Sequence, residues 1–542
     1  MKPPWRQNGV FMITVTNLSF QFGGQLLFKN VDLKFTSGNC YGIIGANGAG
    51  KSTFLRLLCG ELEPTKGSID IPADRRMSVL RQDHFAFDEF TVLDTVMMGN
   101  RRLYDIAKEK EALYEKEDFT DEDGLRASEL EAEFAEMNGW EAESDVSRLI
   151  QGLGLSEDYL YLPMSELKES EKVKVLLAQA LFGSPDIILL DEPTNGLDID
   201  AVTWLEDFLA DYFGTVLVVS HDRHFLNDVC TNIVDIDYGG IKMYVGNYEF
   251  WYESSQLMQR MMKLQNKKTE EKIAELQSFI ARFSANKSKS RQATSRRRLL
   301  DKLTVEEMPA SSRRYPFIGF DMAREAGKDI LFVEGLSKNA PDGTPLFKNL
   351  TFTVAHNEKI ALLGNEMAVT ALFRILAGEE EADGGTVKFG QSITTSYFPH
   401  DNTAYFDGCT DSILDWMRRY SNDTTETYLR GFLGRMLFSG DSVYKEVRVL
   451  SGGERVRCMF SRMMLFNSNF LMLDQPTDHL DLESITAVNN GLNAFKGNVM
   501  LASHDYELLN TVCNRIIEIT PEKITDFSGT YEEYVARNQA NG

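Results

Sequence analysis

Apolar and polar residues follow the same order in the two halves of this chain. Short apolar runs typical of buried strands, such as CYGIIG and IILL, alternate with amphipathic runs of helical periodicity. This alternation predicts an α/β fold built around a largely parallel sheet. The halves also match in sequence: QLLFKNVDLKFTSGNCYGIIG with PLFKNLTFTVAHNEKIALLG, and ILLDEPTNGLDID with LMLDQPTDHLDLE. We therefore expect two copies of one α/β unit in tandem.

The first copy contains an insertion that the second lacks. Gln82 and Leu167 are 85 positions apart (167 − 82), whereas the matching His400 and Leu450 are 50 apart (450 − 400). The extra residues, about 102–137, show two helical runs with a break at Asp121–Gly124 and predict a helical arm. Such a hairpin is either a solvated surface feature or a docking arm, and its presence as an insertion favours docking. The predicted domains are a first copy, a linker and a second copy at residues 12–250, 251–325 and 326–542.

Composition narrows the class of protein. With 43% apolar and 25% charged residues in 542, the chain is globular rather than disordered or rod-like. No run reaches the roughly 18–20 apolar residues that cross a bilayer, and the N-terminus lacks a signal-peptide pattern, so we expect a cytoplasmic protein without membrane contact. The six cysteines are widely spaced and form no CxxC pair, which indicates packed, reduced thiols.

The charge pattern isolates the linker. The formal net charge is −24, which repels nucleic acid over long range, but from Met258 to Tyr315 fifteen Lys or Arg residues face six Asp or Glu. A long helical pattern, the stretch SANKSKSRQATS and then RRRLLDKL predict two helices joined by a basic loop. A solvated helix face would explain the charge; its concentration at the loop favours RNA phosphates as partners. The candidate contacts are Lys287, Lys289, Arg291, Arg296, Arg297 and Arg298.

A complete phosphate-binding loop lies in the first copy. The run from Gly45 to Ser52 fits G-x-x-x-x-G-K-[ST] between an apolar strand and an apolar helix, which is the context that this motif requires. Its glycines let backbone N–H groups converge on phosphates, and the helix N-terminus adds its dipole. Lys51 is expected to reach the β- and γ-phosphates, and Ser52 to bind Mg²⁺. The ATP-binding candidates of this loop are Gly45, Asn47, Gly48, Gly50, Lys51, Ser52 and Thr53.

Further residues supply the chemistry of hydrolysis. The apolar run IILL delivers Asp191, expected to hold Mg²⁺, and Glu192, expected to polarise the attacking water. His221 follows the apolar run LVVS and could contact the γ-phosphate. Gln82 follows MSVLRQ-type strand sequence and could sense the metal or the water, and Phe22 could stack on adenine. The order and spacing of these residues favour one site.

These motifs make the chain resemble the ATP-binding-cassette superfamily over both halves. The resemblance implies that nucleotide lies between two cassettes, with Walker A and Walker B motifs from one and an LSGGE signature from the other. The complete signature lies in the second half, where Leu450 is followed by Ser451, Gly452, Gly453 and Glu454. The first Walker motifs and this signature would therefore complete one ATP site.

The other site lacks most of its apparatus. Its Walker A sequence, from Gly364, is one residue short, and Val369 replaces the lysine. His400 stands at the Q-loop position, and Gln475 replaces the catalytic glutamate. The opposing signature in the first half reads LKESE. Besides the replaced Gln475, the site keeps four residues that match the family's pattern: Thr370, Asp474, Ser503 and His504. We expect a structural or weakly nucleotide-binding site.

The linker and the arm resemble those of ABC-F proteins. This resemblance implies a monomeric translation factor that binds the ribosomal tRNA exit site with ATP, its linker near the P-site tRNA and the large-subunit rRNA, and its arm near the L1 stalk. The short predicted loop, about residues 284–294, favours a housekeeping role over antibiotic protection. The alternative is the fused ATPase subunit of a membrane importer. A DNA-repair role lacks the expected zinc-binding cysteines, and an iron–sulfur recycling type lacks the N-terminal cysteine cluster.

Overall fold

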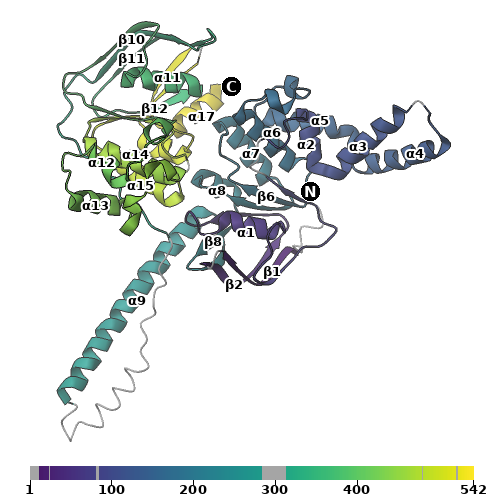
Figure 1. The fold of residues 1–542 in the computed structure, drawn as a ribbon, viewed down its shortest axis with the longest axis horizontal. Helices are drawn as coiled ribbons and strands as arrows, with labels where there is room; N and C mark the ends of the chain where they lie inside the picture. The colour runs from purple at the N-terminus through teal and green to yellow at the C-terminus, as the bar shows by residue number, and fades with distance from the viewer. Residues whose placement is uncertain are drawn as a thin grey trace. The chain divides into compact units, whose positions relative to one another are not determined.

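The chain folds into two compact units of α/β type (Figure 1). The computed structural model describes residues 11–22, 25–80, 85–116, 118–283, 313–478, 480–520 and 523–541. The first unit comprises residues 1–220 and 225–312, and the second comprises residues 221–224 and 313–542.

A six-stranded sheet forms the centre of the first unit, in the order β5-β6-β7-β3-β8-β9. All neighbouring strands pair in parallel except β8 and β9. The central strands are almost entirely apolar and buried, as expected for a parallel sheet covered on both faces. The carboxyl ends of β3, β7 and β6 therefore meet at one edge of the sheet, where loops from all three can build a site. The strands are β3 (Asn39–Ile44), β5 (Met77–Val79), β6 (Ile187–Asp191), β7 (Thr215–Val219), β8 (Asn232–Asp237) and β9 (Gly240–Val245).

A second, antiparallel sheet of the order β2-β1-β4 packs with the first unit's central sheet through helix α1. Its strands are β1 (Phe11–Phe22), β2 (Gln25–Thr36) and β4 (Lys66–Asp70), and α1 spans Lys51–Leu58. Phe28 of β2 and Phe54 of α1 are fully buried in this layer, with their rings edge to face. The prediction of a largely parallel sheet is thus correct for the central sheet but misses this layer.

The second unit repeats the same topology. Its central sheet has the order β14-β15-β16-β12-β17-β18, strand for strand that of the first unit, and its antiparallel sheet has the order β11-β10-β13. This equivalence confirms the prediction of two tandem α/β copies. The strands are β10 (Leu331–Asn339), β11 (Pro345–Val354), β12 (Lys359–Gly364), β13 (Gly384–Phe389), β14 (Thr395–Phe398), β15 (Phe470–Asp474), β16 (Asn498–Ala502), β17 (Arg515–Ile519) and β18 (Ile524–Ser528).

Helices complete both units. Those of the first unit, besides α1, are α2 (Val92–Met97), α3 (Arg101–Tyr114), α4 (Asp121–Glu136), α5 (Ala142–Gly152), α6 (Glu169–Leu181), α7 (Ile199–Ala210) and α9 (Tyr248–Phe283), and α8 (Arg223–Val229) has its first two residues in the second unit and the rest in the first. Those of the second are α11 (Glu366–Ala377), α12 (Ile413–Arg418), α13 (Glu426–Arg435), α14 (Gly452–Phe466), α15 (Leu482–Ala494), α16 (Tyr506–Val512) and α17 (Tyr531–Asn541). Among the described residues, no helix is long and apolar enough to cross a bilayer.

Helices α3 and α4 form the hairpin of the insertion. Ion pairs join them, Arg102 with Glu133 and Arg126 with Glu109. The segment Asp121–Gly124, predicted as a break, is instead the first turn of α4. The reason is a capping box, in which the side chains of Thr120 and Asp123 each bind the other's backbone N–H, and carboxylates in a first turn also suit the helix dipole.

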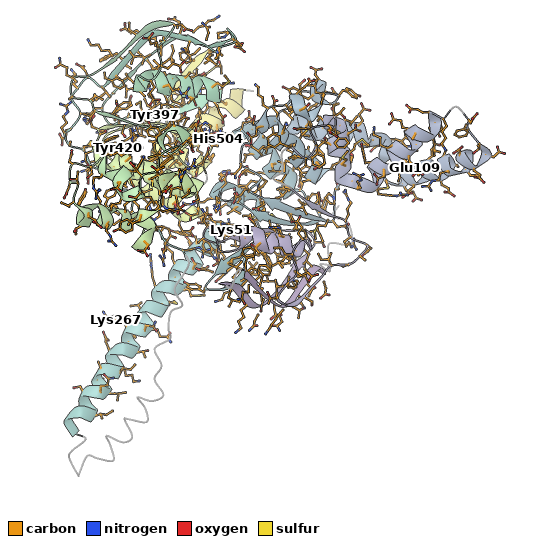
Figure 2. All side chains as sticks on the ribbon, in the orientation of Figure 1. Lys51, Glu109, Lys267, Tyr397, Tyr420 and His504 are labelled. Carbon is orange, nitrogen blue, oxygen red and sulfur yellow. The ribbon has the colours of Figure 1, made fainter. Side chains whose placement is uncertain are left out.

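Helix α9 leads out of the first cassette as a continuous helix of 36 residues, about 54 Å long. It begins at Tyr248, before the predicted linker boundary, because its first turns pack in the cassette. Trp251 is buried there and donates its indole N–H to Asp235 at 3.2 Å. Farther along, Lys267 is exposed on α9 (Figure 2). The predicted basic loop and second helix lie outside the described residues.

Candidate nucleotide sites

The phosphate-binding loop of the first cassette connects β3 to α1. Gly48 and Gly50 have φ angles of 80° and 103°, a left-handed conformation that side chains with a Cβ rarely adopt. Lys51, the first residue of α1, is only 8% exposed, and its ammonium donates to the Gly45 carbonyl at 2.9 Å. Figure 2 labels Lys51 beside α1. The loop thus has the glycine geometry and the buried cation of a phosphate cradle.

A carboxylate at the end of β6 is paired with the loop's hydroxyl. Burial raises the pKa of the Asp191 carboxyl above its ordinary value, while a hydrogen bond from Ser52 and the charge of Lys51 lower it. A partly desolvated carboxylate beside a hydroxyl is the donor set that holds Mg²⁺ in P-loop proteins, so these residues fit that ion. When bound, Mg²⁺ would neutralise phosphate charge.

Glu192 follows β6 in a strained conformation. Its φ is 53°, in the left-handed region, and its N–H donates to the Val219 carbonyl on β7 at 2.8 Å. Left-handed backbone at a residue other than glycine costs free energy and persists where the surrounding structure holds it. This turn lies at the carboxyl end of β6, the edge of the sheet where the phosphate loop lies.

The remaining predicted residues are distributed as follows. Phe22 ends β1 with 70% of its surface exposed, so its ring face is open for stacking. His221 follows β7 and is half-buried. In the second unit, Ser451 is the N-cap of α14, and the Ser451 backbone N–H donates to Glu454 Oε2 at 2.9 Å. The same carboxylate oxygen accepts from Lys445. Gln82 and the six predicted RNA contacts, Lys287, Lys289, Arg291, Arg296, Arg297 and Arg298, lie outside the described residues.

In the second cassette the phosphate loop has become helix. Strand β12 ends at Gly364 and α11 begins at Glu366, with Asn365 alone between them as the N-cap. The Asn365 side chain accepts from the Met367 N–H at 2.9 Å, and its carbonyl accepts from the N–H groups of Ala368 and Val369 at 2.9 and 3.0 Å. These N–H groups are therefore engaged within the turn. Val369, at the lysine position, is 3% exposed and belongs to the apolar core.

Some hydrogen bonds of the first cassette's site nevertheless also occur in the second cassette. Thr370 Oγ1 donates to Asp474 Oδ2 at 2.7 Å, matching the hydrogen bond of Ser52 with Asp191. Burial raises the pKa of Asp474 to about 6, against the opposing effect of the Thr370 hydrogen bond. Gln475 has a φ of 49°, and its N–H donates to the Ala502 carbonyl at 2.9 Å, as Glu192 does to Val219.

Two histidine–carboxylate pairs lie at the second site. His504 Nε2 lies 2.9 Å from Glu366 Oε1, and the His504 N–H donates to Gln475 Oε1 at 3.2 Å. His400 Nε2 lies 3.5 Å from Asp478 Oδ2. Glu366 and Asp478 are not among the residues predicted from the sequence, although Asn365 followed by Glu-Met-Ala is a recognisable helix start.

The charge of His400 is set by its carboxylate neighbours. The hydrogen bond with Asp478 raises the pKa of His400 to about 9, burial opposes it, and the charges of Asp474, Asp478 and Glu366 add to it. His400 is therefore cationic at neutral pH, where the family's Q-loop residue is a neutral glutamine.

This raised pKa predicts a pH-dependent contribution to stability. The folded state holds the His400 proton up to about pH 9, whereas the unfolded chain loses it near pH 6.5. The stabilisation is complete below pH 6.5 and is lost as the pH rises to 9. Urea unfolding of wild type and His400→Gln should show a difference that shrinks by about 1 kcal/mol over this range, the figure being reduced for solvent screening. A difference that stays constant with pH would contradict the assignment.

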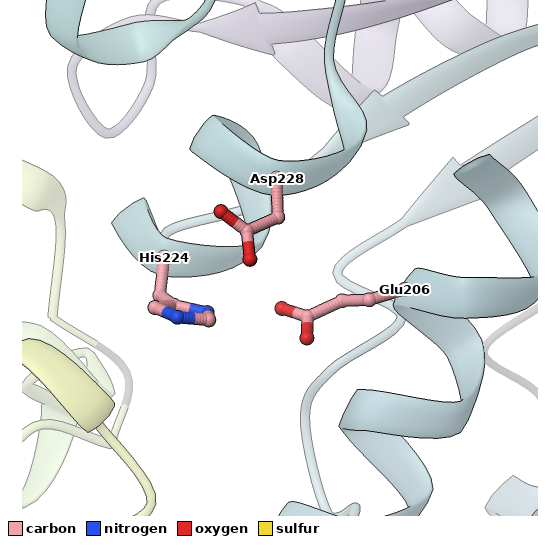
Figure 3. Close-up of side chains that lie close together, drawn as sticks. All are labelled: Glu206, His224 and Asp228. Atoms are coloured by element: carbon pink, nitrogen blue, oxygen red, sulfur yellow. The ribbon is translucent and has the colours of Figure 1, made fainter. Parts of the chain in front are cut away.

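One further group of possible metal ligands occurs among the described residues. Glu206 on α7 and His224 and Asp228 on α8 each offer one ligand atom, all within 4.8 Å of one another (Figure 3). His224 and Asp228 are four residues apart and share a helix face. Two carboxylates are also ordinary ion-pair partners for one histidine, so the arrangement by itself assigns no metal.

Comparisons with known proteins agree on the family. A family model described as ABC transporter matches residues 28–195 and 347–478, and a second ABC transporter model matches residues 234–320. The uncharacterized ABC transporter ATP-binding protein YkpA of Bacillus subtilis (strain 168) is 57% identical over 97% of each chain. The probable ATP-binding protein YbiT of Escherichia coli O157:H7 is 45% identical over 97% of this chain and 99% of its own.

Solved structures share the tandem fold. RNase-L Inhibitor matches with a TM-score of 0.60 and 18% identity, over 97% of this chain and 92% of that one. The archaeal ribosome recycling factor aABCE1, solved with the ribosomal stalk protein aP1, matches with the same values. At this identity the likeness shows the fold alone.

Proposed function

This chain belongs to the ABC transporter family, as a tandem-cassette ATP hydrolase of ABC-F type, and we propose that it acts on the ribosome. In this proposal the protein binds the tRNA exit site in its ATP-bound state, in the cytoplasm, and modulates translation through the linker. ATP hydrolysis then releases it.

The basic linker carries this proposal. In a chain with a net charge of −24, the sequence from Met258 to Tyr315 has fifteen cations against six anions, a local excess of positive charge that suits RNA phosphates. Helix α9 presents Lys267, Lys268 and Lys272 to solvent along its length. An ATPase subunit that docks only on membrane partners has no need for a long basic helix of this kind.

The arm suits a different kind of contact. Its cations are paired with its own carboxylates, including Arg101 with Asp105, Lys116 with Asp123 and Arg126 with Glu109. Its exposed aromatic residues include Tyr114 and Phe119, whose rings stack at 6.3 Å. Such a surface favours a protein partner over RNA phosphate, so in the proposed complex the arm contacts the protein part of the L1 stalk.

ATP hydrolysis is assigned to the first cassette's motifs. In the proposed site, Lys51 and the loop amides bind the β- and γ-phosphates, while Ser52, Asp191 and Gln82 hold Mg²⁺. Glu192 polarises the attacking water, and His221 contacts the γ-phosphate. The supporting residues are Phe22, Gly45, Asn47, Gly48, Gly50 and Thr53, with the signature Ser451, Gly452, Gly453 and Glu454 as the expected completion.

Co-sedimentation with ribosomes tests the proposal. We expect Glu192→Gln to sediment with ribosomes in ATP and not in ADP, because glutamine keeps the side chain's shape but is a poor base, so the ATP-bound state persists. Wild type should sediment less than the variant in ATP. Equal sedimentation in ATP and ADP, or none in either, would refute the ribosomal role. Detergent-dependent co-purification with a membrane protein would instead identify an importer subunit.

A further inference from the structure

At the second cassette's site, groups that would contact a nucleotide are bonded to the protein itself. In a P-loop the backbone N–H groups before the helix are left for phosphates. Here the corresponding segment is the first turn of α11, and the N–H groups of Met367, Ala368 and Val369 bind Asn365, so these three donors are not free for a phosphate. The loss is thus structural and extends beyond the missing lysine.

A carboxylate of the protein lies where a bound nucleotide would place a phosphate. Glu366 is the first residue of α11, where negative charge is favoured by the helix dipole, and it faces the imidazole of His504 at 2.9 Å. His504 matches His221, whose expected ligand is the γ-phosphate. The backbone N–H of His504 also donates to Gln475 Oε1 at 3.2 Å.

The local charge also disfavours nucleotide. Glu366, Asp474 and Asp478 bring three carboxylates to this end of the sheet, against the two imidazoles of His400 and His504. A triphosphate would have to displace Glu366 from His504 and approach Asp474. The first cassette also has a carboxylate at this position, Asp191, but it adds the ammonium of Lys51, which the second cassette lacks.

We infer that Glu366 is an internal substitute for the γ-phosphate, which keeps the loop of His504 engaged in the absence of nucleotide. The second cassette then keeps this loop in one state whether or not the first cassette holds ATP. One cassette senses ATP, and the other serves as a fixed counterpart. This inference concerns the isolated chain and does not depend on the ribosomal role.

Hydrogen exchange of the full chain, with and without MgATP, tests the inference. It is measured in the Glu192→Gln background, in which ATP is expected to be hydrolysed slowly and so to remain bound. We expect residues 503–513 to exchange at the same rate in both conditions, while residues 45–58 slow in MgATP. Adding Glu366→Gln should speed exchange at 503–513 about two- to fivefold in both conditions, the range for a half-exposed pair. The exposed carboxylate Glu381 offers a matched control, and Glu381→Gln should change nothing at 503–513.

Two results would overturn the inference. One is slowing of residues 503–513 by MgATP to the degree seen at 45–58, and the other is unchanged exchange in Glu366→Gln. A double-mutant cycle covers the case in which Glu366→Gln loosens the whole cassette. The effect of Glu366→Gln on the melting temperature should disappear in a His504→Gln background. An equal effect in both backgrounds would exclude an interaction between Glu366 and His504.

Discussion

Glu192→Gln is expected to lower kcat for ATP hydrolysis about 10²- to 10³-fold, because the general base is lost while the shape of the side chain is kept. MgATP binding should change by less than about twofold, since the phosphate contacts of Lys51 and the loop remain. Steady-state phosphate release and equilibrium ATP binding measure the two effects.

The second cassette provides a matched control for this variant. Gln475 has the same left-handed backbone as Glu192 and the same N–H contact to the neighbouring strand. Gln475→Glu therefore restores the family's residue in the family's geometry. We expect no gain in ATPase activity, since the helical turn at Asn365–Val369 offers no phosphate cradle. Two results would show that the second site hydrolyses ATP. One is an ATPase rate of Gln475→Glu above that of wild type, and the other is a Glu192→Gln variant that keeps more than about a tenth of the wild-type rate.

The sequence was sufficient for those parts of the site that depend on local motifs. The run Gly45–Ser52 predicts its own loop and helix, and the repeat predicts that Gln475 and His504 occupy the positions of Glu192 and His221. The two equivalent sheet orders bear out the repeat. Such features follow from short-range chemistry and from duplication, both of which can be read along the chain.

Other features depend on choices that the sequence leaves open. The one-residue deletion after Gly364 indicates a damaged loop, but it does not say that Asn365 caps a longer helix and places Glu366 against His504, 138 positions away. The antiparallel sheet requires β1 and β4 to pair across the phosphate loop and α1, which no local pattern specifies. Asp121–Gly124 could end one helix or begin the next, and the Thr120 capping box decides between them.

Reversing the six predicted linker contacts to glutamate should weaken ribosome binding by at least about tenfold at 0.15 M salt, because each lost phosphate contact also removes released counterions. The slope of log Kd against log salt should fall by about 0.7 or more for each phosphate contact that is lost. The changes are made at Lys287, Lys289, Arg291, Arg296, Arg297 and Arg298, and binding is measured by sedimentation across a salt series in the Glu192→Gln background with ATP.

A control with the same total charge separates a local contact from general repulsion. Six exposed lysines of the cassettes can be reversed instead, at Lys29, Lys66, Lys242, Lys348, Lys388 and Lys523. This variant changes the net charge equally, so long-range repulsion from RNA increases equally, but it leaves the linker unaltered. We expect its salt slope to match that of the parent. Equal weakening in both variants would mean that the ribosome responds to overall charge, and unchanged binding in the linker variant would exclude the linker as the RNA contact.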